Sequence, residues 1–157
     1  MSYGMQYTAV AVATSQTASV DLFEITAPSD ATVLVTALYI SQSSDYGDAA
    51  AEGLKVQMIK GYTVSGSGGN TVTPTPLQSG YAAAGGVVES HNTTLANTGS
   101  PLTIHEDIMN VQIGYQWRPA PNEYIVLSPS QRLVVRLAAP TDALTLAGTL
   151  YFTEVGG

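Results

Sequence analysis

Apolar and polar residues alternate with a period of two along most of this chain, and this period predicts β-strands. Near the end of the chain, Leu144, Leu146, Leu150 and Phe152 alternate with threonine, alanine and tyrosine. Successive side chains of a strand point to opposite faces, so the alternation places one set against a core and the other toward solvent. In residues 32–40 both sets are largely apolar, and we expect that strand to be buried on both faces.

The predicted strands are rich in threonine, valine, tyrosine and isoleucine, as pleated and half-buried surfaces favour. They cover residues 7–14, 20–27, 32–40, 54–61, 87–94, 102–117, 132–137 and 144–153. Residues 48–52 and 107–110 could each form one helical turn, with the long segment 102–117 breaking at the second of them. Short strands separated by Pro, Gly, Ser and Asp predict an all-β protein, a jelly-roll-like β-sandwich of about eight antiparallel strands.

The length of 157 residues suits a single domain. Residues 1–7 come before the first predicted core strand and are expected to form an N-terminal arm, and residues 8–157 the β-sandwich. A long connection at residues 62–86 contains a Gly/Ser run followed by Thr-Pro-Thr-Pro, which predicts a flexible loop. Two interpretations of this loop stay open: an arm that lies along a neighbouring protein, or a surface loop without a partner.

The charge balance disfavours several classes of partner. Five Lys and Arg residues stand against twelve Asp and Glu residues, so the net charge is −7. Binding to nucleic acid needs several basic contacts to phosphates, and we therefore expect no nucleic-acid partner. Residues 1–14 lack the pattern of a signal peptide, and the longest apolar region, residues 31–40, is shorter than the roughly 20 residues of a membrane-spanning helix. We expect a protein made in a cytoplasm, with no membrane partner.

Catalytic and metal-binding signatures are weak. The chain has no cysteine, which excludes disulfides, thiolate zinc sites and a cysteine nucleophile. His91 and His105 lie on different predicted strands, and His105 and Glu106 point to opposite faces, so a shared metal ion is not expected. The acidic residues Asp45, Asp48 and Glu52 do not have the spacing of a calcium loop. No serine nucleophile motif precedes a helix. The sequence therefore predicts neither an enzyme nor a cofactor.

Aromatic and methionine side chains near the expected arm and loop are candidates for contacts with another protein. Tyrosine and tryptophan are enriched at interfaces because rigid rings give contact area at a small entropy cost. The candidate interface residues are Tyr3, Met5, Tyr7, Tyr62, Tyr81 and Trp117. Ordinary packing in the core is the alternative for Trp117, as it is for Tyr39 and Tyr115.

Several segments together resemble the small virion proteins encoded beside the major capsid protein of tailed phages. The similarity extends from about residue 7 to residue 154 and rests on residues 21–28, 61–76, 92–94, 110–114 and 148–154. The resemblance implies a head decoration, or cement, protein that binds the outer surface of the capsid between capsomers as a homodimer or homotrimer. It implies no individual functional residue, because the class has no site motif shared with this chain.

The predicted function is therefore that of a non-enzymatic structural virion protein whose partner is the major capsid protein. Residues 1–7 and 62–86 are the segments expected to hold the capsid, in part by strand addition. The alternative is a carbohydrate- or receptor-binding jelly-roll module of a phage fibre or a lectin, with a site at Tyr115, Trp117, Asn122 and Glu123. A third class, a small enzyme, would require activity that depends on His105 or Glu106.

Overall fold

The computed structural model describes residues 4–47 and 52–156, and it confirms the prediction of an all-β protein. The described residues form twelve strands and one short 3-10 helix, η1 (Pro121–Glu123). The strands are β1 (Met5–Gln16), β2 (Val20–Thr26), β3 (Ala31–Gln42), β4 (Gly53–Val64), β5 (Asn70–Val72), β6 (Thr75–Pro76), β7 (Val87–Asn92), β8 (Asn97–Asn110), β9 (Tyr115–Trp117), β10 (Ile125–Leu127), β11 (Arg132–Leu137) and β12 (Leu144–Gly156). No helix within these described residues is long and apolar enough to cross a membrane.

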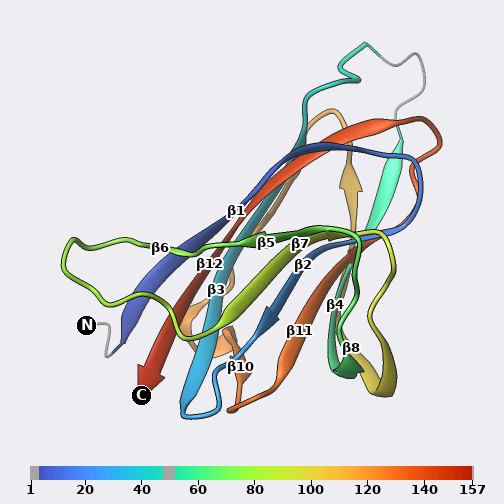
Figure 1. Ribbon diagram of the computed structural model, residues 1–157. Coiled ribbons are helices and arrows are strands. Elements are labelled where there is room, and N and C mark those ends of the chain that lie inside the picture. The colour runs from blue at the N-terminus through green and yellow to red at the C-terminus, as the bar shows by residue number, and fades with distance from the viewer. Residues whose placement is uncertain (1–3, 48–51, 157) are drawn as a thin grey trace.

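The strands form two antiparallel sheets that lie face to face (Figure 1). Sheet A has the order β10-β3-β12-β1-β6, with β9 also paired to β3. Sheet B has the order β5-β7-β2-β11-β4-β8. The first four strands alternate between the two sheets, so the chain crosses from one layer to the other at each of these connections.

The core fills the space between the sheets with aliphatic and aromatic side chains. Tyr7, Phe23 and Phe152 are the largest of the fully buried side chains, and the rings of Tyr7 and Phe152 stack with their centroids 5.4 Å apart. Burial of a large apolar side chain contributes about 1.5–3 kcal/mol relative to exposure. The inward half of each alternating strand pattern therefore provides the main stabilisation of the sandwich.

The strand boundaries follow the predicted pattern in some places and depart from it in others. The predicted segment 132–137 coincides with β11. The segment 102–117 is two strands, β8 and β9, and the turn between them spans residues 111–114. The predicted helical turn at 107–110 is wrong, because these residues continue the pairing with β4 as far as Asn110 opposite Gly53. The other predicted turn lies outside the described residues except for Glu52, which is not helical.

Three short strands explain most of the difference between twelve strands and the expected eight. β5 and β6 lie inside the connection 62–86, which we expected to be a loop, and β10 follows η1. Each has only two or three residues and pairs with the edge of a longer strand. A period of two cannot be recognised in so few residues, so the sequence pattern gives no sign of them. β3 also differs from expectation, because its outward residues from Thr32 to Tyr39 are half-buried where we expected burial on both faces.

The described part of the expected N-terminal arm belongs to sheet A. Residues 1–3, including Tyr3, lie outside the described residues. Met5 pairs with Glu154 as the first rung of β1, and Tyr7 pairs with Phe152 on one side and Pro76 on the other. The expectation that Met5 and Tyr7 precede the domain is therefore wrong. The alternation of the strand starts two residues earlier than predicted, and the ring of Tyr7 supplies core volume.

Candidate functional site

The outer surface of sheet A carries almost no charge, which sets it apart from sheet B. Within the described residues, the strands of sheet A contain one charged side chain, Glu154, near the end of β12. Its carboxylate accepts hydrogen bonds from the backbone N–H groups of Gly85 and Gly86, at 3.0 and 2.7 Å. The strands of sheet B carry Asp21, Glu24, Lys55, Lys60, Glu89, Glu106, Asp107, Arg132 and Arg136. The surface made by the outward side chains of β1, β12, β3 and β9, together with the turn at residues 111–114, is called the uncharged face below.

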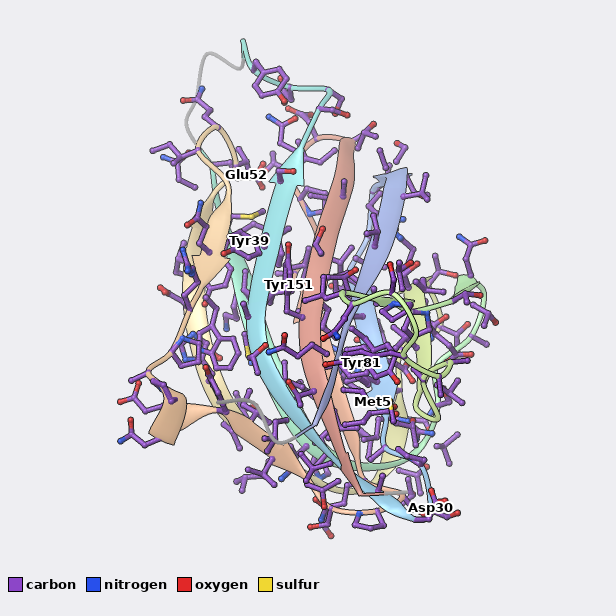
Figure 2. All side chains as sticks on the ribbon, turned by 90° about the vertical axis from the view of Figure 1, so that its left-hand side faces the viewer. Met5, Asp30, Tyr39, Glu52, Tyr81 and Tyr151 are labelled. Carbon is purple, nitrogen blue, oxygen red and sulfur yellow. The ribbon has the colours of Figure 1, made fainter. Side chains whose placement is uncertain are left out.

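Aromatic and aliphatic side chains stand on the uncharged face. Tyr39 on β3 and Tyr151 on β12 contact each other edge to face, with ring centroids 5.7 Å apart. Figure 2 looks onto this face and shows the two tyrosines near its middle, while the carboxylates labelled there, Asp30 and Glu52, lie at its two ends. The exposed aliphatic side chains are Val10 at 54%, Val12 at 74% and Ile113 at 84% exposure.

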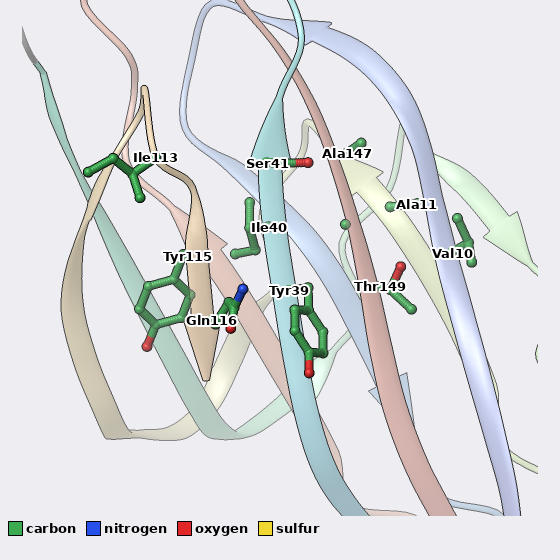
Figure 3. Close-up of a pocket in the computed structure, with 11 residues that line it drawn as sticks. Val10, Ala11, Tyr39, Ile40, Ser41, Ile113, Tyr115, Gln116, Ala147 and Thr149 are labelled. Carbon is green, nitrogen blue, oxygen red and sulfur yellow. The ribbon is translucent and has the colours of Figure 1, made fainter. Parts of the chain in front are cut away.

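A shallow hollow of about 340 Å³ crosses the uncharged face. Figure 3 shows that its lining comes from β1, β12 and β3, from β9, and from the turn before β9. Ala147, Thr149 and Ser41 line it with small side chains, and Ile113 and Tyr39 are the larger side chains beside them. No acidic or basic side chain lines the hollow. The hollow suits an apolar or aromatic side chain of a partner.

A second hollow, of about 430 Å³, lies where the edge of sheet B meets the edge of sheet A. His105 on β8 is the centre of its polar contacts: its Nε2 atom is 2.7 Å from the Tyr115 hydroxyl, and its ring centroid is 6.2 Å from that of Trp117. Burial, with a smaller contribution from Asp107, raises the pKa of Tyr115 to about 12. The phenol therefore stays protonated at neutral pH. Asp107, Gln116, Arg118 and Glu123 complete the polar lining, and we call this site the aromatic hollow.

The Gly/Ser run at residues 65–69 is held against the outer side of sheet B, where the composition predicted a flexible loop. The Ser65 hydroxyl lies 2.7 Å from a carboxylate oxygen of Glu24 and 2.6 Å from one of Glu89. The backbone N–H of Gly66 donates to Glu24 at 2.8 Å. At Gly69 a Cβ atom would lie 2.1 Å from the carbonyl oxygen of Ser90, so only glycine permits this close approach.

The predicted interface residues occupy separate places. Tyr7 is buried, and its hydroxyl donates to the carbonyl of Ala82 at 2.9 Å. Met5 lies beside it, with its sulfur 3.3 Å from the Tyr7 hydroxyl. Burial raises the pKa of Tyr7, and the nearby Glu154 and Tyr81 raise it further. Met5, Tyr7 and Tyr81 therefore form one group near the start of β1, and Tyr7 is closed to any partner.

The other two described interface candidates are far from this group in the fold. Tyr62 contacts Arg136 on sheet B: the guanidinium lies 5.1 Å from the ring centroid, and its Nη1 atom donates to the Tyr62 hydroxyl at 2.9 Å. This contact gives Tyr62 a structural partner inside the chain. Trp117 is half-buried in the aromatic hollow. The five candidates within the described residues therefore do not make up one surface.

The residues that make up the uncharged face, among them Val10, Val12, Tyr39, Ile113 and Tyr151, were not recognised as a group in the sequence. A usable signal exists, because residues 5–16, 31–42 and 144–153 each lack any charged side chain. These segments become one surface only through the pairing of β1 with β12 and of β12 with β3. Strand pairing between segments so far apart along the chain cannot be derived from their periodicity.

Comparison with protein-family models, with curated proteins and with solved structures finds no match to this chain. Among residues 4–47 and 52–156, no group of three or more His, Asp or Glu side chains is arranged to hold a metal ion. The candidate functional surfaces are therefore the uncharged face of sheet A and the aromatic hollow.

Proposed function

We propose that this protein is a non-enzymatic structural component of a tailed-phage virion. In this role it binds the outer surface of the head between subunits of the major capsid protein and stabilises the shell. The observation that carries the proposal is the uncharged face. The centres of protein interfaces are depleted of charged residues and enriched in aromatic ones, and a contiguous exposed apolar surface marks an interaction site.

The segregation of charge supports an oriented attachment. A net charge of −7 keeps copies of the protein apart and soluble. With sheet A against the shell, the charged outer side of sheet B points to solvent and no charged side chain of the strands has to be desolvated, apart from Glu154. Many copies on one symmetric shell act together, so each contact can be weak.

We assign the sandwich to the jelly-roll class, and the strand order supports the assignment. Sheet A contains the run β1-β12-β3-β9, and sheet B contains the corresponding run β2-β11-β4-β8. In both runs the early strands of the chain are interleaved with the late ones, as two Greek keys wrapped together require. β7 and β5 extend sheet B beyond β2.

Co-sedimentation with undecorated heads of the phage that encodes this chain tests the capsid proposal. The informative variant is Ile113→Asp, which places a charge on the uncharged face at a side chain that is 84% exposed. The matched control is Leu102→Asp on β8 of sheet B, at 66% exposure. We expect saturable binding of the wild type, at least about tenfold weaker binding of Ile113→Asp, since desolvating one unpaired charge costs several kcal/mol, and unchanged binding of the control. Absence of wild-type binding, or equal losses in both variants, would contradict the proposal.

The aromatic hollow supports a second candidate, binding of a carbohydrate or receptor. Tyr115, Trp117 and Glu123 of the sequence-based alternative line this one hollow, whereas Asn122 does not. Ligand sites combine apolar or aromatic walls with a few converging polar groups, and sugar rings have both kinds of surface. Trp117 is the single tryptophan, so its fluorescence reports on the hollow directly. A saturable change with a glycan, abolished in Glu123→Ala, would favour this function, and no response across a glycan panel would reject it.

A further inference from the structure

A further hollow, of about 460 Å³, lies between β4, β8 and the turn that leads into β11. Its lining residues are Lys60, Gly61, Tyr62, Thr63, Ser100, Leu102, Ser130, Gln131 and Arg132. The set contains two of the five basic residues of the chain and no acidic residue. The lining is therefore opposite in charge to the chain as a whole, whose net charge is −7. We call this site the basic hollow.

Lys60 is a cation whose charge is not balanced by a neighbouring carboxylate. Its Nζ atom donates to the carbonyl oxygen of Val126, at 2.6 Å. No acidic side chain among residues 4–47 and 52–156 forms an ion pair with it. An ammonium group has three N–H donors, so the Val126 carbonyl leaves two of them for a ligand. A ligand anion would therefore supply the missing negative charge.

Arg132 is held in place through one nitrogen of its guanidinium. Its Nε atom donates to the Thr26 hydroxyl at 3.1 Å and lies 3.6 Å from a carboxylate oxygen of Glu24. Within the described part of the chain, neither Nη atom has a hydrogen-bond partner. Glu24 thus balances part of the charge without occupying the two Nη groups. These groups form the fork that binds two oxygens of one phosphate or carboxylate group.

Neutral hydrogen-bond donors accompany the two cations. The side-chain carbonyl of Gln131 accepts from the backbone N–H of Ser128 at 3.0 Å, which fixes the amide and leaves its NH₂ group without a partner among the described residues. The hydroxyl groups of Thr63, Ser100 and Ser130 also have no hydrogen-bond partner in residues 4–47 and 52–156. Every polar side chain of the lining can therefore donate a hydrogen bond, as recognition of an oxyanion requires.

We propose that the basic hollow binds a tetrahedral oxyanion, a phosphate or sulfate group, with Lys60 and Arg132 as its charged contacts. The donors come from two strands and a turn, and the oxygens of a tetrahedral group point in several directions at once, whereas those of a carboxylate lie in one plane. The inference goes beyond capsid binding, because the lining belongs to β4, β8, β11 and the turn before β11. This side stays in solvent when sheet A docks on a shell.

Titration of the full chain with inorganic phosphate, followed through its backbone amide signals by NMR, tests the proposal. Low ionic strength is needed because salt screens contacts of this kind. We expect saturable shifts in β4 and in residues 128–131, and binding of acetate at least about tenfold weaker. A parallel titration with sulfate separates the two sources of the group, and saturation by either ion supports the proposal. No saturable response to both ions, or tighter binding of acetate, would overturn it.

Two variants locate the anion. Lys60→Gln removes one cation, and Leu102→Asp removes no donor but places a carboxylate directly opposite Lys60 in the β4–β8 ladder. We expect each to weaken phosphate binding at least about tenfold. The matched control is Arg118→Gln, which changes the net charge as Lys60→Gln does but lies in the aromatic hollow, whose lining shares no residue with the basic hollow. Equal losses in Arg118→Gln and Lys60→Gln would show an effect of net charge alone and overturn the proposal.

Discussion

The ion pair between Asp21 and Arg136 on sheet B gives the sharpest stability prediction. The Asp21 side chain is 0% exposed, and that of Arg136 is 17% exposed. Arg136 donates to both carboxylate oxygens of Asp21, at 2.6 and 3.1 Å, and to the carbonyl of Ala96 at 3.0 Å. The Ala96 N–H donates to Asp21 at 2.6 Å. Replacing Arg136 with methionine keeps much of the side-chain volume and removes every one of the guanidinium contacts.

The expected cost follows from what Asp21 retains. In Arg136→Met the carboxylate stays buried with the Ala96 N–H as its remaining hydrogen-bond donor. Breaking a buried pair from one side costs about 3–5 kcal/mol, because the remaining charge is uncompensated. Asp21→Asn is expected to cost less, about 2 kcal/mol, because the partly exposed guanidinium of Arg136 can still reach water.

Urea denaturation followed by circular dichroism measures these differences, provided that the slope of the transition is unchanged. Lys55→Met is the matched control. The Nζ atom of Lys55 lies 3.9 Å from Oε1 of Glu106, and the two side chains are 47% and 48% exposed. Exposed pairs of this kind contribute about 0–1 kcal/mol. If the free energy of unfolding of Arg136→Met lies within about 1 kcal/mol of that of the control, burial does not make this pair costly to break.

Three further predictions concern single side chains. Burial lowers the pKa of His91 below its ordinary value of 6.5; the unfolded chain then binds more protons, so stability decreases as the pH falls below about 6.5. In His91→Gln the free energy of unfolding, measured by denaturation from neutral to acidic pH, should depend less on pH. An unchanged pH dependence would contradict the role of His91. Tyr7→Phe removes the hydrogen bond to Ala82 and should cost about 1 kcal/mol in urea denaturation; a cost near zero would mean that the bond is not formed. Gly69→Ala forces Cβ onto the Ser90 carbonyl and should lower the stability by about 1–3 kcal/mol, whereas a neutral effect would show that this segment is not held against sheet B.

The alternation of apolar and polar residues predicts most of the long strands. It does not predict which residues come together in the uncharged face and the aromatic hollow. The strand at residues 132–137 is predictable because Leu133, Val135 and Leu137 form one face, while both arginines lie on the other. β11 has these bounds. Tyr7 was misplaced because proximity to the chain end outweighed the strand period that continues through it. Composition alone predicts a flexible Gly/Ser run, whereas its glycines permit close approach to Glu24 and Ser90. That contact depends on tertiary structure, which composition does not encode.

Pairing between distant segments is also what creates both candidate sites. His105 and Trp117 share a hollow because the turn at residues 111–114 takes the chain from β8, at the edge of sheet B, to β9, at the edge of sheet A. Tyr39 and Tyr151 meet because β3 pairs with β12, more than a hundred residues along the chain. The sequence contains the residue types of both sites but does not indicate their neighbours.

In the proposed function, the uncharged face of sheet A is the surface that docks on the shell. A cryo-electron microscopy map of heads decorated with the purified protein tests it most directly. We expect β1, β3 and β12 to face the major capsid protein, with Tyr39 and Ile113 inside the contact and sheet B toward solvent. Density that places sheet B against the shell, or heads that carry no added density, would contradict it.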